Sequence, residues 1–244
     1  MTDYYDVINV KTPNKTRSYQ PVSNKEMIEL LKDQVGIFLP EFTLEKEKYW
    51  LSSDSQRMMA KLMLTSEVQK DEPPLCVVIK NSYDKSTATA IGTGVGLDND
   101  RIWMRNGDIT LFRKHTKYVM PSLSANIAKS LDTAAHRYEE LLLLSKLLRE
   151  VPCEDAHAFA LFGIARGYGM IGVRAMSDAY KNWNSWDKPG PKGKTLWDVS
   201  ESILAYVEDR GDPASMMEDA GSLGSVVEML PDIFNIKREA SNES

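Results

Sequence analysis

The residues best suited to chemistry lie between positions 101 and 118, where aromatic and basic side chains alternate. Asn106-Gly107 separates two alternating runs, RIWMR and DITLF, and this pattern predicts a two-residue β-hairpin with a type I′ turn. Bases of single-stranded nucleic acid stack on aromatic rings while cations follow the phosphates, so such a hairpin suits a single strand. Alternation gives it a core surface of Ile102, Met104, Ile109 and Leu111 and an outer surface of Arg101, Trp103, Arg105 and Phe112.

Further basic residues extend this predicted interface along the chain. Five basic residues against one acid give positions 101–118 a formal charge of +4. The NSYDKS turn, between two expected strands, offers additional polar and basic groups to a phosphate. The full set of predicted nucleic-acid contacts is Arg101, Trp103, Arg105, Phe112, Arg113, Lys114, His115, Lys117, Lys80, Asn81 and Lys85.

Each part of this interface also has a purely structural interpretation. Trp103 and Phe112 can instead pack beneath the long helix that follows, with the arginines extending past them, and an Arg105–Asp108 pair would reduce the local charge. The NSYDKS run is also typical of an Asx-type turn, in which Asn, Ser and Asp side chains bond their own backbone. The sequence leaves both interpretations open.

The charge of the chain is unevenly distributed. Its 244 residues carry 30 Lys and Arg against 35 Asp and Glu, a formal net charge of -5, which argues against coating duplex nucleic acid by bulk charge. Positions 198–244 hold eleven acids and three basic residues, a charge of -8. Such a segment competes for a nucleic-acid groove, recruits a partner, or forms a solvated face.

The histidines offer only a weak metal site. His136 with Glu139, and Glu154 with His157, are i,i+3 pairs on a helix face. Carboxylate-bridged di-metal bundles need two Glu-x-x-His pairs and two further carboxylates, whereas these two pairs run in opposite order. We therefore expect ordinary exposed or capping residues and no metal.

Nucleotide and nucleophile motifs are also absent from the sequence. The G-x-G-x-x-G pattern at 167–172 follows a helical segment instead of a strand, and GTGVG at 92–96 lacks the Lys of a P-loop. Cys76 and Cys153 are isolated and are expected to be free thiols. We expect no cofactor and assign no catalytic residue.

The elements that must position these residues follow from hydrophobic periodicity. A helix capped by Ser23 or Asn24 and ended by Gly36 precedes up to six strands between positions 37 and 116. A helix of almost thirty residues then runs through 122–150. Later helical segments are expected at 152–183, 195–210 and 222–230, with the clearest linker at 186–194.

Strands first and helices afterwards predict an α+β fold, with an antiparallel, meander-like sheet in the N-terminal half and a helical C-terminal half. The predicted parts are an extended arm at 1–18, a single domain at 19–230 with its sheet at 19–116 and helices at 121–230, and a polar tail at 231–244. The first residues have no secretory pattern, and no run approaches a membrane span, so we expect a cytoplasmic protein without membrane contact.

Several short motifs, in order, resemble a known family. An apolar strand at 77–79 precedes NSYDKSTA at 81–88, RKHT at 113–116 precedes the long helix, and PVSNKEMIELL and TLWDVSESILAYVEDR are similar as well. Together they resemble the phage/plasmid-like proteins grouped as a domain of unknown function (family 932), over most of the chain between Tyr19 and Arg210. Lys114 departs from that pattern because it interrupts the usual Arg-His pair. The resemblance implies a mobile-element origin and no established activity.

We therefore expect a non-enzymatic phage or plasmid protein that binds single-stranded nucleic acid in the host cytoplasm, in replication or recombination. The strand-strand-strand-helix order also resembles the core of single-strand annealing proteins, at the level of fold alone. A protein–protein or host-takeover module is an alternative, with a host or phage protein as partner, and homo-oligomerisation stays open. A metal-dependent enzyme that uses His115, His136 or His157 is the other alternative.

Overall fold

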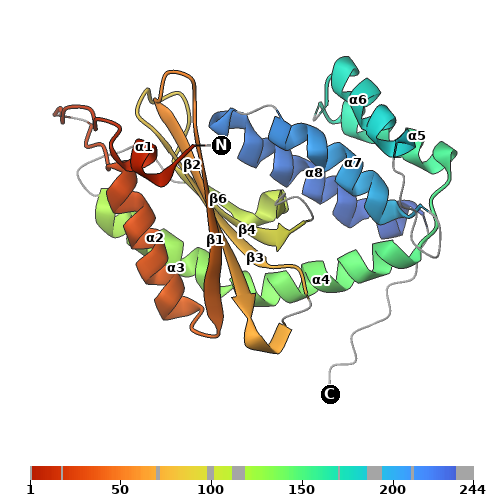
Figure 1. Cartoon of the computed structure of the whole chain (residues 1–244), viewed down its shortest axis with the longest axis horizontal. Helices are drawn as coiled ribbons and strands as arrows, with labels where there is room; N and C mark the ends of the chain where they lie inside the picture. The colour runs from red at the N-terminus through yellow and green to blue at the C-terminus, as the bar shows by residue number, and fades with distance from the viewer. Residues whose placement is uncertain are drawn as a thin grey trace.

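A six-stranded antiparallel sheet occupies the N-terminal half of the computed structural model, and helices form the C-terminal half (Figure 1), as the α+β prediction requires. The structure describes residues 2–17, 19–69, 72–97, 102–111, 119–169, 171–185, 194–209 and 212–234. The strands are β1 Phe42–Leu51, β2 Arg57–Ser66, β3 Leu75–Ser82, β4 Ala90–Gly96, β5 Ile102–Trp103 and β6 Ile109–Leu111. Their order is β1-β2-β3-β4-β5, and β6 also pairs with β4.

The helices cover both faces of this sheet. Figure 1 shows α2 and α3 on one side of the strands and α7 and α8 on the other, with α5 and α6 farther out. The helices are α1 Tyr4–Ile8, α2 Asn24–Phe38, α3 Val119–Asp132, α4 Ala134–Glu150, α5 Asp155–Gly167, α6 Val173–Asn184, α7 Leu196–Asp209 and α8 Pro213–Ile233.

The register of the sheet determines which side chains share a face. Residues paired directly across four strands form the row Tyr49, Ala60, Ile79 and Ile91. This apolar row lies on the face toward α2 and α4, where Lys32 pairs with Glu47 and Tyr138 packs edge-on against Phe42. Because neighbours along a strand point to opposite faces, the next row lies on the side of α8. That row is Lys48, Lys61, Val78 and Gly92.

Local sequence explains several of these elements. The Ser23 hydroxyl accepts a hydrogen bond from the Glu26 amide, while the Glu26 carboxylate accepts one from the Ser23 amide, which is the predicted capping box of α2. The helix continues through Gly36 to Phe38, so the expected end at Gly36 is wrong by two residues. The residues of β3 are all buried because helices cover both of its faces.

The predicted hairpin at 101–112 is wrong. β5 and β6 do not pair with each other; each pairs with β4, at Val95–Trp103 and Ile91–Thr110 respectively. A 3₁₀ turn, Asn106–Asp108, connects them, and Gly107 does not have the positive φ of a type I′ turn.

The glycines of β4 provide a physical reason for this departure. A Cβ added to Gly94 would lie 2.9 Å from the Cβ of Met104, and one added to Gly92 would lie 3.2 Å from its sulfur. The missing side chains leave room for Met104 to fold over the face of β4 instead of continuing along a hairpin. The Met104 carbonyl in turn meets Gly224 of α8, where an added Cβ would lie only 1.7 Å away. Tertiary packing therefore overrides the local turn preference.

The long helix expected at 122–150 is interrupted at Thr133, which separates α3 from α4. The segment expected at 152–183 also divides into two helices, α5 and α6, with Gly169 between them at a φ of 74°. Positive φ suits glycine, which lacks the Cβ that makes this region costly for other residues. Gly169 therefore lies at a break between two helices and not on a strand-to-helix loop.

The two ends of the chain carry more helix than the sequence predicts. The expected extended arm at 1–18 contains α1, which Asp3 caps by accepting a hydrogen bond from the Tyr5 amide. The short helix expected at 222–230 is the 21-residue α8, which begins with Pro213 at its first position. Most of the expected linker at 186–194 and of the polar tail lies outside the described residues.

Candidate nucleic-acid interface

Trp103, the predicted stacking residue, lies in the core. Its relative exposure is 0%, and its ring packs edge-on against Trp197 of α7 at a centroid distance of 5.2 Å. The expectation that Trp103 faces solvent is therefore wrong. The alternative interpretation is correct that this ring is buried, but the ring packs against α7 and α8 and not beneath the helix expected at 122–150. A ring that is enclosed on all sides cannot stack on a base in this conformation.

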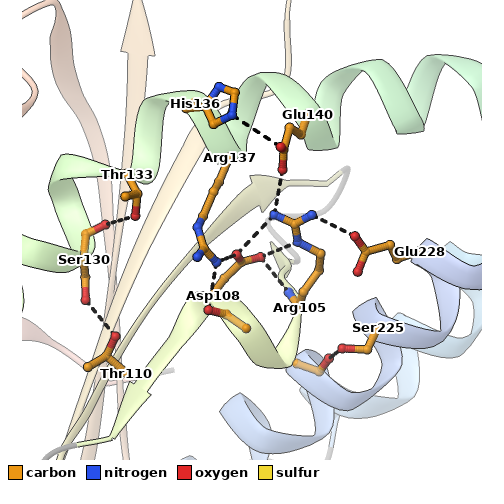
Figure 2. Close-up of polar contacts among 12 residues, drawn as sticks. Arg105, Asp108, Thr110, Ser130, Thr133, His136, Arg137, Glu140, Ser225 and Glu228 are labelled. Atoms are coloured by element: carbon orange, nitrogen blue, oxygen red, sulfur yellow. Dashed lines mark hydrogen bonds and ion pairs between the residues drawn. The ribbon is translucent and has the colours of Figure 1, made fainter. Parts of the chain in front are cut away.

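Arg105, the second key residue of the predicted hairpin, lies in an ionic cluster (Figure 2). Its Nε donates to Asp108 Oδ2 at 2.9 Å, its Nη1 to Glu228 Oε1 at 2.9 Å, and its Nη2 to Glu140 Oε2 at 3.1 Å. Asp108 also accepts a hydrogen bond from Arg137 of α4. The guanidinium of Arg105 thus joins the turn to α4 and α8.

The cluster neutralises the charge that the sequence assigned to nucleic acid. The side chain of Asp108 is fully buried and lies between two guanidinium groups. Burial lowers the pKa of Arg105, but hydrogen bonds and charge attraction from Asp108 and Glu228 outweigh it, so that the net pKa is raised. Arg105 is therefore a permanent cation, and carboxylates within hydrogen-bonding distance neutralise its charge. The sequence interpretation of an Arg105–Asp108 pair is correct, whereas Glu140 and Glu228 were not expected.

The NSYDKS loop forms the Asx-type turn of the structural interpretation. Asp84 accepts hydrogen bonds from the Ser82 and Ser86 hydroxyls at 2.5 and 2.6 Å and from the Ser86 amide at 2.9 Å. Burial raises the pKa of Asp84, but these hydrogen bonds and the charge of Arg57 together lower it by more. The net pKa is therefore below its ordinary value. Lys85 adopts a φ of 63° within this turn.

The three predicted contacts in and before this loop have different surroundings. Lys80 is 2% exposed and pairs with Glu218 of α8. The Asn81 amide is buried and donates to the Val22 carbonyl at 3.1 Å and to Asn24 Oδ1 at 2.9 Å. Lys85 is exposed, with its Nζ 4.2 Å from the ring centroid of Tyr19. The remaining predicted contacts lie outside the described residues: Arg101, Phe112, Arg113, Lys114, His115 and Lys117.

The structure gathers a different group of basic and aromatic residues, which we call the basic patch: Lys46, Lys48, Trp50 and Lys61. Lys48 on β1 lies directly opposite Lys61 on β2, and Trp50 lies diagonally from Lys61 with its ring centroid 5.4 Å from the Lys61 Nζ. Lys46 is exposed and Lys48 and Trp50 are half-buried, whereas Lys61 is 1% exposed. All four share the α8-facing side of the sheet.

A sequence signal for this patch exists but lies outside the segment that drew attention. In EKEKYWL, alternate positions hold Lys46, Lys48 and Trp50, so a strand places them on one face. Glu47 points to the other face, where Lys32 of α2 pairs with it at 2.6 Å. Only the register of β1 against β2 brings Lys61 to the same place.

Carboxylates at the start of α8 pair with two other cations of the same sheet. Arg57, at the start of β2, lies between Asp84, 3.6 Å from its Nε, and Asp212, 3.4 Å from its Nη1. Glu218, six residues further along the chain, pairs with Lys80. The acidic C-terminal segment therefore meets cations of the sheet in these two places.

No family model, curated protein or solved structure matches this chain. The resemblance at NSYDKSTA and the neighbouring motifs therefore remains a prediction from the sequence.

The histidines that the structure describes form no metal centre. His136 faces Glu140, with 3.4 Å between Nε2 and Oε1, and the ring of His157 packs edge-on against Phe234. Among the described residues, no three His, Cys, Asp or Glu side chains are grouped to hold an ion. The described helices also include none that is long and apolar enough to cross a membrane.

Proposed function

We propose that this chain is a non-enzymatic, mobile-element protein that binds single-stranded nucleic acid through the basic patch. The mobile-element part rests on the sequence resemblance, and replication or recombination is the proposed context. The binding part rests on one observation, which is that Lys48 and Lys61 lie directly opposite each other beside Trp50. A tryptophan beside several lysines on one face of a sheet combines the two features that single-strand sites use, aromatic stacking of bases and positive charge along the backbone.

The chemistry of the patch suits a single strand better than a duplex. Lysines on alternate positions of β1 follow a phosphate backbone at about 6.6 Å intervals, twice the rise of a strand. Trp50 offers a partly exposed ring on which an unpaired base stacks, and stacking of this kind contributes about 1–3 kcal/mol per base. Bases inside a duplex do not present their faces to such a ring.

The test is binding of a fluorescent single-stranded oligonucleotide to the whole chain, measured by anisotropy at several salt concentrations. With two or three phosphate contacts, the slope of log K against log salt is about -1.4 to -2.1. Lys46→Glu/Lys48→Glu is expected to weaken binding by about tenfold or more at low salt, and Trp50→Ala by about fivefold or more, since 1 kcal/mol corresponds to about a fivefold change.

A matched control changes the same charge elsewhere. Lys25→Glu/Lys129→Glu alters two exposed lysines on α2 and α3, which lie across the sheet from α7 and α8 (Figure 1). This variant is expected to bind nearly as wild type does, because charges beyond about 10 Å are screened at 0.1 M salt. Equal losses in both double variants, or unchanged binding in the folded Lys46→Glu/Lys48→Glu variant, would remove the patch as the site.

A protein–protein module is the second candidate, and the surface of α5 and α6 favours it. Phe159 is 50% exposed and stacks on Tyr180 at a centroid distance of 4.8 Å. Partly exposed aromatic pairs are enriched where proteins contact one another. A specific partner that is retained after nuclease treatment and lost on Phe159→Ala would favour this candidate over nucleic-acid binding.

A further inference from the structure

Helix α8 lies on the same face of the sheet as the basic patch. Gly92 of β4 belongs to the cross-strand row of Lys48 and Lys61, and an added Cβ on Gly92 would lie 2.6 Å from the terminal methyl of Met217. The helix therefore packs on the β2–β3 part of this face and reaches β4 at Gly92, and the more exposed residues of the basic patch lie on β1 beside it. Figure 1 shows α8 beside the strands over much of its length.

Ion pairs connect α8 and the residue before it to three cations of the sheet and its connecting turn. They join Asp212 to Arg57 at 3.4 Å, Glu218 to Lys80, and Glu228 to Arg105 at 2.9 Å. In each pair the carboxylate is the more exposed partner, at 42%, 49% and 38%, above a cation at 26%, 2% and 14%. The carboxylates are thus the more solvent-exposed partners, so a phosphate that approached these pairs from solvent would meet negative charge.

Apolar packing holds α8 in place. Met216, Met217, Leu223 and Val227 are almost fully buried, so exposing the helix would return a large apolar surface to water. An effect of α8 on binding must therefore act through side-chain charge while the helix stays seated. Glu228 belongs to the cluster around Asp108. Asp212 and Glu218 instead pair with Arg57 on β2 and Lys80 on β3. Lys80 lies opposite Met59, which is two residues from Lys61 of the basic patch.

We propose that Asp212 and Glu218 are built-in competitors of nucleic acid, which neutralise Arg57 and Lys80 and confine a bound single strand to the β1–β2 end of the sheet. This inference rests on the function proposed above and adds its regulation. The carboxylates keep the affinity at low salt down and thereby make its dependence on salt shallower. A partner or condition that engages these carboxylates would increase the affinity without unfolding the helix.

The test compares Asp212→Asn/Glu218→Gln with wild type in the oligonucleotide assay. The variant lacks two negative charges that would each lie roughly 8–10 Å from a bound phosphate in water. Loss of their repulsion is expected to tighten binding by about fivefold at low salt. The ratio of the variant's affinity to that of wild type is expected to fall toward one as salt rises, because the Debye length shortens to about 3 Å at 1 M. Adding Lys46→Glu/Lys48→Glu to the amide variant is expected to abolish the gain.

The control is Glu29→Gln/Asp178→Asn, which removes two exposed carboxylates that also pair with lysines, Lys25 and Lys181, on α2 and α6. Asp212→Asn alone guards against misfolding, because Arg57 keeps its pair with Asp84. Affinity equal to wild type in Asp212→Asn/Glu218→Gln and in Asp212→Asn alone, with wild-type binding still dependent on Lys46 and Lys48, overturns this inference and leaves the proposed function intact. Absence of binding by wild type, by Asp212→Asn/Glu218→Gln and by Asp212→Asn overturns this inference and the proposed function together.

Discussion

The two edges of the sheet carry similar residues but differ in what packs on them. At the β5–β6 edge, Trp103 is enclosed by α7 and α8, and Arg105 is paired with Asp108, Glu140 and Glu228. At the β1–β2 edge, Trp50 remains half-buried and Lys46 exposed. A tryptophan among cations is therefore not by itself a binding surface. Its role depends on whether helices deliver carboxylates and apolar side chains to that edge.

The difference arises from the glycines that bring α8 close. Gly92 and Gly94 on β4 accept Met104, and Gly224 on α8 accepts the Met104 carbonyl, so strand, turn and helix stack at short distances. Close contact excludes water, and each buried charge in the turn then needs a partner. The predictions below separate the closed edge from the open one.

The largest expected effect distinguishes the two tryptophans. Trp103→Ala is expected to lower the free energy of unfolding by about 3–5 kcal/mol, because it leaves a large cavity between α7 and the sheet. Trp50→Ala is expected to cost much less stability while weakening oligonucleotide binding. Urea denaturation and anisotropy, run on the same two variants, measure both quantities. Similar losses of stability in both would contradict the comparison.

The buried carboxylate of the turn is the next test. Asp108→Asn is expected to destabilise the protein by about 3–5 kcal/mol, because Arg105 and Arg137 then share no buried anion. Glu140→Gln removes a carboxylate of the same cluster that is 48% exposed, and is expected to cost below about 1 kcal/mol. A small loss for Asp108→Asn in chemical denaturation would mean that the cluster does not hold the closed edge together.

A pair of helix glycines tests the close approach itself. Alanine normally stabilises a helix interior by about 1 kcal/mol relative to glycine. Gly163→Ala in α5, where an added Cβ meets nothing within 4 Å, is expected to show this gain. Gly224→Ala is expected to destabilise by about 1–3 kcal/mol instead, because its Cβ would overlap the Met104 carbonyl. Thermal melts should therefore shift in opposite directions, and a shift of the same sign would refute the contact.

The smallest expected effect concerns Asp84 beside Arg57, near the open edge. The folded-state pKa of Asp84 is lowered, so its ionised form stabilises the protein above the unfolded pKa of about 3.9. That stability is lost as pH falls through the folded-state pKa. Asp84→Asn is expected to cost below about 1 kcal/mol at pH 7, and the difference from wild type should shrink below about pH 4. A difference that grows on acidification would contradict the lowered pKa.

The sequence predicts the elements better than their contacts. Apolar runs separated by turn residues locate the first four strands, and Ser23 with Glu26 identifies the start of α2, because both signals depend on residues close together in the chain. The turn at 104–108 is mispredicted because its decisive partners are distant in the chain. Arg137 lies 29 positions after Asp108, and Gly224 lies 116 positions after it.

The candidate site shows the same division. Alternate Lys46, Lys48 and Trp50 are readable in the sequence as one face of a strand. Their proximity to Lys61, and the position of Asp212 and Glu218 next to Arg57 and Lys80, are not readable there. These relations depend on strand register and on the seating of a helix more than 130 residues after Lys80.

The sequence alone determined the α+β class, because the period of hydrophobic residues changes from two to near four along the chain and needs no distant partner to be read. It also determined where charge of each sign accumulates. Only the tertiary structure decided which cations are cancelled and which aromatic ring is enclosed. Burial and ion pairing depend on the distances between elements, and glycines at three positions of two elements set those distances here.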